Sequence, residues 1–216
     1  CQERAKRMVS LKPNGFQITL PDWWPPTFNE SKNFILGMQE VVEDIYMILY
    51  NPPHAKVLLS LEEISLLKQS VQNLVGIKCA GGDEQWYSQR RDILPDFSVF
   101  VPGHTVVYGK PLGANGSYSN VACLSPNGAV KIWDLIEKDY EKAKELEAKV
   151  LNFMKQYILP FATKLSNTGL DKLLASVGGW GPVSEKVLWP YDGATGEDVK
   201  KIKIHANNEL KEIINV

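Results

Sequence analysis

The chain has 216 residues, of which 44% are apolar and 23% charged, a balance typical of a globular protein with a sizeable core. Its 24 basic and 25 acidic residues leave a formal net charge of −1, without the basic excess of a nucleic-acid-binding protein. No apolar stretch approaches the roughly 20 residues that cross a bilayer. We therefore expect one domain, or a domain with an appendage, that has neither nucleic acid nor a membrane as its partner.

Three cysteines, Cys1, Cys79 and Cys123, are too few for a disulfide framework. Cys79 and Cys123 lie in apolar runs with the character of strands, and the beginning of the chain lacks the apolar core of a signal peptide. These features favour a reducing, cytoplasmic location. The chain starts at Cys1, within a polar segment of helical character, which indicates that a preceding part is missing.

Short runs rich in β-branched and aromatic residues predict five strands, separated by segments with helical spacing. The predicted strands are residues 15–20, 45–50, 75–79, 98–101 and 116–121. Capping boxes at Thr27 and Ser60, and a cap at Ser125 before Pro126, mark the starts of three helices. The runs are nearly continuous in apolar residues, as is usual for parallel strands covered on both faces. The order predicts five βα units of an α/β fold.

The pattern changes after about Glu137. Residues 140–157 are rich in Lys and Glu at helical spacing, which indicates a solvated helix face, and residues 195–214 predict another capped helix. We therefore predict an α/β part over residues 1–137 and a C-terminal helical region over residues 138–216.

Two architectures fit five parallel strands. An open doubly wound sheet usually carries a glycine-rich phosphate motif, but neither GxGxxG nor GxxxxGK[ST] occurs, and Gly81-Gly82 is more typical of a tight turn. The alternative is part of an eight-stranded barrel, whose usual length of about 250 residues exceeds that of this chain. In both architectures, the chemistry lies at the carboxyl ends of the strands.

Two predicted strand ends carry candidate catalytic residues, Lys78 and Tyr50. Lys78 lies in an apolar run, where burial would lower the pKa of its ammonium toward the neutral amine that attacks carbonyl carbons and forms Schiff bases. Tyr50 ends the preceding run, and its phenol can pass protons in such a reaction. The alternative interpretations are a lysine that extends its amine into solvent and a half-buried tyrosine whose hydroxyl is satisfied at the rim.

Two spaced motifs around these residues resemble those of a known family. Tyr50-Asn51-Pro52-Pro53 and Gly76-Ile77-Lys78 are similar to the YN-x-P and GIK motifs of the dihydrodipicolinate synthase / N-acetylneuraminate lyase family, and residues 112–119 (LGANGSYS) are similar to its LGxxGxxS strand. The motifs are fairly specific for the family and weak for any one substrate. The resemblance implies a TIM (β/α)8 barrel, of which this chain holds about the last five βα units, units four to eight, followed by the helical appendage.

The resemblance also implies an activity, that of a class I aldolase or lyase acting on carbon–carbon or carbon–oxygen bonds. Lys78 would form a Schiff base with pyruvate or another 2-oxo acid, and Tyr50 would be the proton shuttle. Gly103 and Tyr118 would line the pocket around the lysine. The implied partners are the 2-oxo acid and an aldehyde, with no cofactor, and the full-length parent would be a homotetramer.

Two positions depart from the pattern of the synthases. Those enzymes usually carry an arginine shortly after YN-x-P that binds the carboxylate of the aldehyde, whereas this chain has His54-Ala55-Lys56 there. We expect His54 to contact the aldehyde instead. A second tyrosine of the family falls about where Trp23 and Trp24 stand, which makes Trp24 a candidate for substrate contact; packing in a wall or interface is the alternative. Tryptophan cannot accept and return a proton as a phenol does.

The first three βα units of the family have no counterpart before Gly15, and five strands cannot close an eight-stranded barrel. The resemblance thus implies an N-terminally truncated chain, whose inferred function is that of its parent. The alternative is a catalytically inactive fragment or degenerate barrel that acts only as a scaffold or binding module. In the chain alone, four apolar strand side chains are expected to face water in part: Ile18, Ile48, Ile77 and Phe100. We predict no metal site, because the spacing of the three histidines resembles no ligand set.

Overall fold

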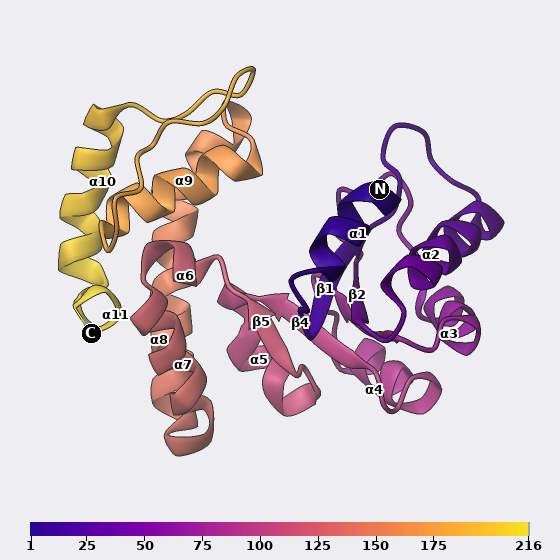
Figure 1. Cartoon of the computed structure of the whole chain (residues 1–216). Coiled ribbons are helices and arrows are strands. Elements are labelled where there is room, and N and C mark those ends of the chain that lie inside the picture. The colour runs from indigo at the N-terminus through magenta and orange to yellow at the C-terminus, as the bar shows by residue number, and fades with distance from the viewer. Residues whose placement is uncertain (216) are drawn as a thin grey trace. The chain divides into compact units, whose positions relative to one another are not determined.

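The computed structural model describes residues 1–215 and contains five strands, each followed by a helix (Figure 1). The strands are β1 (Gly15–Thr19), β2 (Tyr46–Tyr50), β3 (Leu74–Lys78), β4 (Ser98–Pro102) and β5 (Gly116–Tyr118). The helices before β5 are α1 (Gln2–Val9), α2 (Phe28–Val42), α3 (Leu61–Ser70), α4 (Glu84–Ile93) and α5 (Val106–Leu112). Those after β5 are α6 (Val121–Leu124), α7 (Pro126–Lys138), α8 (Tyr140–Phe153), α9 (Asn167–Gly178), α10 (Gly196–Glu209) and α11 (Lys211–Ile214). The predicted α/β order is confirmed.

The helices α2, α3 and α7 begin at the residues that the capping signals predicted. The Thr27 amide donates to Glu30 Oε2 at 2.7 Å, and the Glu30 amide donates to Thr27 Oγ1 at 3.3 Å, so both directions of the capping box are made. Ser60 makes the same pair of bonds at the start of α3. At α7, Ser125 Oγ accepts from the Gly128 amide at 3.0 Å. These bonds satisfy amides that the first helical turn leaves without partners.

The strands form one sheet in the order β1-β2-β3-β4-β5, and the pairs from β1 to β4 are parallel (Figure 1). Consecutive strands are therefore neighbours, joined by helical crossovers, as in a barrel wall. Because parallel neighbours run in the same direction, the carboxyl ends of β1, β2 and β3 meet at one edge of the sheet.

The two faces of the sheet differ in burial. In the register, a row of apolar residues crosses four strands with exposed fractions of 5% or less: Ile18, Leu49, Ile77 and Val99. We call this side the covered face. The next residue of each strand forms a second row, whose members are exposed or half-buried: Thr19, Tyr50, Lys78 and Phe100. We call that side the open face.

This alternation corrects one expectation. Ile18 and Ile77 do not face water; they are buried on the covered face. Ile48 and Phe100 are half-buried on the open face, as expected. The error arose because a short, nearly continuous apolar run does not reveal which alternate residues point to which face, whereas the register does.

The fifth strand is shorter than predicted. It ends at Tyr118 rather than at residue 121, because the Ser119 side chain accepts from the Ala122 amide at 3.2 Å and turns the chain into α6. Cys123 therefore lies in α6 and not in a strand. Cys79 directly follows β3, and burial raises the pKa of its thiol.

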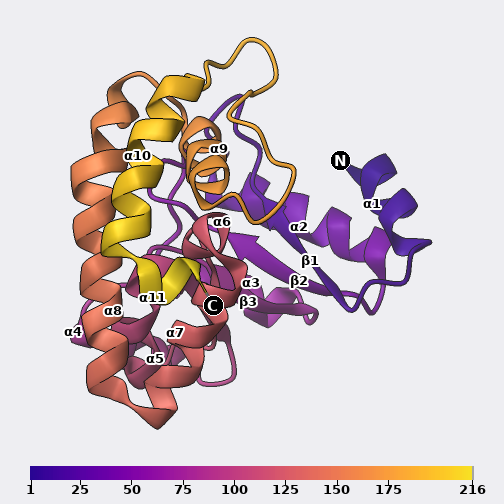
Figure 2. The same cartoon turned by 90° about the vertical axis from the view of Figure 1, so that its left-hand side faces the viewer.

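The chain divides into two compact units. The first contains residues Cys1–Val101 and Leu112–Gly116, and the second contains Pro102–Pro111 and the residues from Ser117 onward. In the second unit, α9 packs against α6 and α10, and α7 packs against α8 and α11 (Figure 2). The predicted division into residues 1–137 and 138–216 stays a prediction.

Ion pairs join the charged face of α8 to α11 within the second unit. Glu212 contacts the ammonium groups of Lys142 and Lys149, each at 2.8 Å. Their hydrogen bonds lower the pKa of the Glu212 carboxyl to about 2. Residues 154–158 continue α8 as a π-helical turn, so most of the predicted helix over residues 140–157 is confirmed. No helix within residues 1–215 is long and apolar enough to cross a membrane.

Candidate functional site

The carboxyl ends of the first strands bring the two candidate catalytic residues side by side. Tyr50 and Lys78 are the last residues of β2 and β3 and are register partners. The backbone adds a second tie, because the Asn51 amide donates to the Lys78 carbonyl at 2.8 Å. Thr19, the last residue of β1, is the register partner of Tyr50 on the other side. Three neighbouring strand ends thus present a hydroxyl, a phenol and an amine on the open face.

The Lys78 side chain lies over the ring of Tyr50. Its Nζ is 4.0 Å from the ring centroid, within the range of a cation–π contact. The contact holds the amine at the strand end and provides an attractive surface for its charged form. The His54 ring also meets the Tyr50 ring edge-on, with 6.3 Å between the ring centroids and 79° between the ring planes. Tyr50 therefore contacts both a potential nucleophile and a second titratable group.

A small pocket of about 190 Å³ opens beside Tyr50. Two segments line it, the end of β1 with the residues that follow it, and the loop after β2: Thr19, Leu20, Pro21, Asp22, Tyr50, Pro52, His54, Ala55, Lys56 and Val57. The polar groups comprise a hydroxyl, a carboxylate, a phenol, an imidazole and an ammonium. Such a set can bind a small polar molecule through hydrogen bonds and one charged contact.

Tyr50, Lys78 and His54, three of the site residues predicted from the sequence, lie together in the structure. Thr19 and Asp22 also line the pocket, although no role was predicted for them. Thr19 could have been found by aligning the ends of the predicted strands, because parallel neighbours that end together place their last residues in one row. Asp22 carries no such signal, since it lines the pocket through the fold of a loop.

The two tryptophans after β1 are exposed to solvent. Trp23 is 93% exposed and Trp24 is 77% exposed, and the pocket is lined instead by the residues just before them. Within the described first unit, the structure therefore does not place Trp24 against the pocket beside Tyr50. Contact of Trp24 with a substrate stays a prediction.

Gly103 and Tyr118 lie in the second unit. A side chain at position 103 would overlap Ser119, so this turn requires glycine. His104 and Asn120 are hydrogen-bonded at 3.1 Å beside it. Tyr118 is 40% exposed. Gly103, which the resemblance implies as a pocket residue, thus contacts Ser119, the last residue of the LGxxGxxS match, within one unit.

A half-buried carboxyl supports the turn that follows Gly103. Glu147 of α8 accepts a hydrogen bond from the Val107 amide at 2.9 Å, across 40 positions of the sequence. Burial raises the pKa of the Glu147 carboxyl, while bonds from the Val107 and Tyr108 amides oppose that shift. The first turn of α5 is therefore held by a side chain that no local pattern indicates.

The LGANGSYS segment owes its shape to tandem arginines of α4. Arg90 Nη2 donates to the Gly113 carbonyl at 2.8 Å, and Arg91 Nη1 donates to the Leu112 carbonyl at 2.6 Å. Gly113 has φ of 118°, a conformation that favours glycine. Asn115 then accepts from the Val99 amide at 2.9 Å and donates to its carbonyl at 2.7 Å. These contacts are structural and account for Gly113 and Asn115 of the motif.

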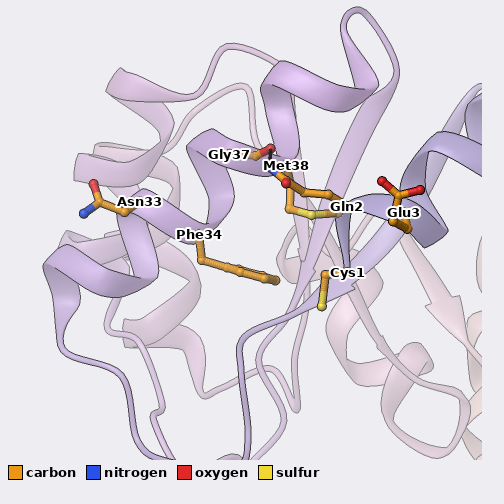
Figure 3. Close-up of a pocket in the computed structure, with 7 residues that line it drawn as sticks. All are labelled: Cys1, Gln2, Glu3, Asn33, Phe34, Gly37 and Met38. Carbon is orange, nitrogen blue, oxygen red and sulfur yellow. Dashed lines mark hydrogen bonds between the residues drawn. The ribbon is translucent and has the colours of Figure 1, made fainter.

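A second hollow lies at α1 and α2, and none of the predicted site residues lines it (Figure 3). Its lining is Cys1, Gln2, Glu3, Asn33, Phe34, Gly37 and Met38. Gln2 Nε2 donates to the Gly37 carbonyl at 2.9 Å and closes one side, while the Phe34 ring extends toward Cys1. Within residues 1–215, no group of three His, Cys, Asp or Glu side chains gathers as metal ligands would.

The sequence matches a curated relative. The chain is 23% identical over 186 residues to a 4-hydroxy-tetrahydrodipicolinate synthase of Kosmotoga olearia. The match covers 79% of this chain and 62% of that enzyme, so the chain spans less than two thirds of the relative's length. No family model matches the chain.

Solved structures share the fold over nearly the whole chain. A prophage protein of the dihydrodipicolinic acid synthase family from E. coli K12, solved in complex with pyruvate, has a TM-score of 0.80 at 19% identity, covering 97% of this chain and 70% of that one. An N-acetylneuraminate lyase from Fusobacterium nucleatum has a TM-score of 0.78 at 17% identity, covering 96% and 69%. The comparisons confirm the resemblance to this family, and the fold is that of part of an α/β barrel.

Proposed function

We propose that this chain carries the Schiff-base centre of a lyase of the dihydrodipicolinate synthase / N-acetylneuraminate lyase family. Lys78 is the amine that reacts with pyruvate or another 2-oxo acid, and Tyr50 is the proton shuttle. One observation carries the proposal: the two residues are register partners at the carboxyl ends of parallel strands, with Nζ 4.0 Å above the ring. The pyruvate complex of one structural neighbour supports the choice of 2-oxo acid.

The chemistry follows from these two groups. The neutral Lys78 amine adds to the C2 carbonyl of the 2-oxo acid, the carbonyl oxygen takes up a proton, and loss of water leaves an imine. The imine withdraws electrons from the adjacent carbon, so a bond from that carbon to an aldehyde carbon can form or break. Each step moves a proton, and the phenol of Tyr50 is the group beside the amine that can donate and accept it.

The aldehyde binds in the pocket on the Tyr50 side. His54 and Lys56 are its cationic or hydrogen-bonding contacts, in place of the arginine that synthases of the family usually carry. Gly103 and Tyr118 complete the site in the full-length parent, which we infer from the resemblance to be a cytoplasmic homotetramer. The acceptor is an aldehyde whose anionic group, if it has one, is held by an ammonium and not by a bidentate guanidinium.

Borohydride trapping tests the proposal. In the full-length parent, pyruvate and borohydride should leave a reduced three-carbon adduct on Lys78, detected by mass spectrometry of the digested protein. Lys56→Arg is a matched control in the same unit, and it should keep the adduct. An adduct distributed over surface lysines, or of equal yield in Lys78→Arg, contradicts the assignment, because a guanidinium stays protonated and cannot form the imine.

A scaffold without catalytic activity is the second candidate. It is favoured by the five-stranded sheet of the described residues, since a closed barrel of this kind has eight strands. A well-folded full-length parent that forms no adduct at any pyruvate concentration would support the scaffold and exclude the Schiff-base centre.

A further inference from the structure

The side chain of Asn51 forms a clasp across the loop that follows β2. Asn51 Nδ2 donates to the Leu59 carbonyl at 2.9 Å, and the Leu59 amide donates to Asn51 Oδ1 at 3.1 Å. One side-chain amide thus satisfies both backbone groups of a residue eight positions away. Asn51 is 6% exposed and Leu59 is 4% exposed, so water does not readily replace these bonds.

The same residue anchors the loop to the catalytic strand end. The Asn51 amide donates to the Lys78 carbonyl at 2.8 Å, directly after the register pair of Tyr50 and Lys78. Two prolines follow Asn51 and have no amide hydrogen, so they cannot add ladder bonds. At its far end the loop leads into Ser60, the N-cap residue whose capping box starts α3. Its two ends are therefore held by Asn51 and by α3.

The residues between these anchors include His54 and Lys56, which line the pocket beside Tyr50. Within the described loop interior, the Ala55 amide donates to the Pro52 carbonyl at 2.9 Å, a local bond that spans three residues. The clasp is therefore the longer-range hydrogen-bonded link across the segment that carries His54 and Lys56.

We propose that Asn51 is a positioning residue, whose clasp on Leu59 holds His54 and Lys56 against Tyr50 on the aldehyde side of the site. The inference rests on the proposed function. Asparagine is required because the clasp needs a donor and an acceptor on one short side chain. Aspartate retains the acceptor but lacks the donor and brings a charge into a buried position, and alanine leaves both backbone groups of Leu59 without partners.

The chain offers a matched control in Asn73. It is 8% exposed, and its Nδ2 donates to the carbonyls of Glu43 at 3.0 Å and Ile45 at 2.8 Å. This second clasp lies just before β3, at the amino ends of the strands, away from the pocket. Asn51→Ala and Asn73→Ala therefore each remove two side-chain bonds to the backbone, from opposite ends of one sheet.

The test compares three readouts in the whole chain. In Asn51→Ala and Asn51→Asp, amides 54–59 should exchange with deuterium at least tenfold faster, and the His54 ring protons should lose the shift that the Tyr50 ring imposes. The KM for aspartate semialdehyde or N-acetylmannosamine should rise roughly 10- to 100-fold, the scale of a misplaced binding group, while the yield of the pyruvate adduct at Lys78 stays the same. Asn73→Ala should change none of these readouts.

The outcomes separate this inference from the proposed function. Absence of the pyruvate adduct in the unmodified chain overturns the proposed lyase function and, with it, the role of Asn51 in aldehyde binding. In that case, deuterium exchange of amides 54–59 and the His54 ring shift still test whether the Asn51 clasp holds the loop. If the adduct forms but aldehyde kinetics are absent, or are equal in the unmodified chain and the Asn51 variants, the positioning role is wrong. Equal effects of Asn51→Ala and Asn73→Ala on the three readouts would show a general loss of stability and overturn it as well.

Discussion

The covered and open faces of the sheet are formed by alternate residues of the same strands, but the covered face carries the core and the open face carries the candidate reactive groups. Leu49 and Ile77, on the covered face, are 0% and 1% exposed, whereas the next residue of each strand, Tyr50 or Lys78, is half-buried on the open face. Consecutive residues of a strand point to opposite sides, so one residue step separates the core from the candidate chemistry.

This difference explains how a rigid core can support a reactive edge. Burial of the covered face stabilises the sheet by about 1.5–3 kcal/mol for each large side chain, without involving a polar group. The open face then holds a phenol and an amine at adjacent strand ends at little structural cost. The faces should therefore respond differently to substitution, the covered face in stability and the open face in reactivity.

The largest expected effect is complete loss of the pyruvate adduct in Lys78→Arg. The longer cation keeps a charge over the Tyr50 ring but cannot become a neutral amine, so the melting temperature should change little. Trapping with borohydride and a thermal melt on the same sample measure both quantities. A large drop in melting temperature together with loss of the adduct would show that Lys78 contributes to stability as well as to reactivity, contrary to the predicted difference between the faces.

Tyr50→Phe should keep the ring that contacts Lys78 and His54 but remove the phenol. We expect adduct formation to slow by about 10²–10⁴-fold, the usual range for a positioned proton donor, with stability nearly unchanged. The rate is measured by quenching with borohydride at successive times. An unchanged rate of adduct formation would show that Tyr50 only packs against its neighbours and transfers no proton.

Leu49→Ala and Ile48→Ala compare the two faces at neighbouring positions. Leu49 is fully buried, so its truncation should lower the free energy of unfolding by about 2–5 kcal/mol. Ile48 is half-buried on the open face, and its truncation should cost clearly less. Denaturant unfolding followed by circular dichroism measures both. Equal losses would mean that the open face contributes to the core as much as the covered face does.

The smallest expected effect concerns the aldehyde. Without an arginine after Tyr50, the site should bind aspartate semialdehyde roughly 10- to 100-fold more weakly than a site with a charge-assisted bidentate contact, which is worth about 1.5–3 kcal/mol. Lys56→Arg should recover part of this affinity. If the unmodified chain already matches an arginine-containing synthase in KM, His54 or Lys56 replaces the arginine fully.

Local signals in the sequence determined much of the architecture. The five strands begin within one residue of their predicted starts, because β-branched and aromatic runs between capped helices leave few alternatives. Thr27, Ser60 and Ser125 cap helices as predicted, since a capping box is completed within four residues of chain. The pairing of Tyr50 with Lys78 also followed from strand ends, because parallel neighbours align their carboxyl ends.

Only the tertiary structure decided on which face of the sheet each strand residue lies and which hydrogen bonds hold the loops. Ile18 and Ile77 are buried because the register places them on the covered face, a choice that a period of two leaves open in a short apolar run. The clasp of Asn51 on Leu59, the Glu147 bond to Val107 and the exposure of Trp24 each depend on where a loop folds back. No local propensity or spacing encodes these features, because each is set by how a loop packs against the rest of the fold.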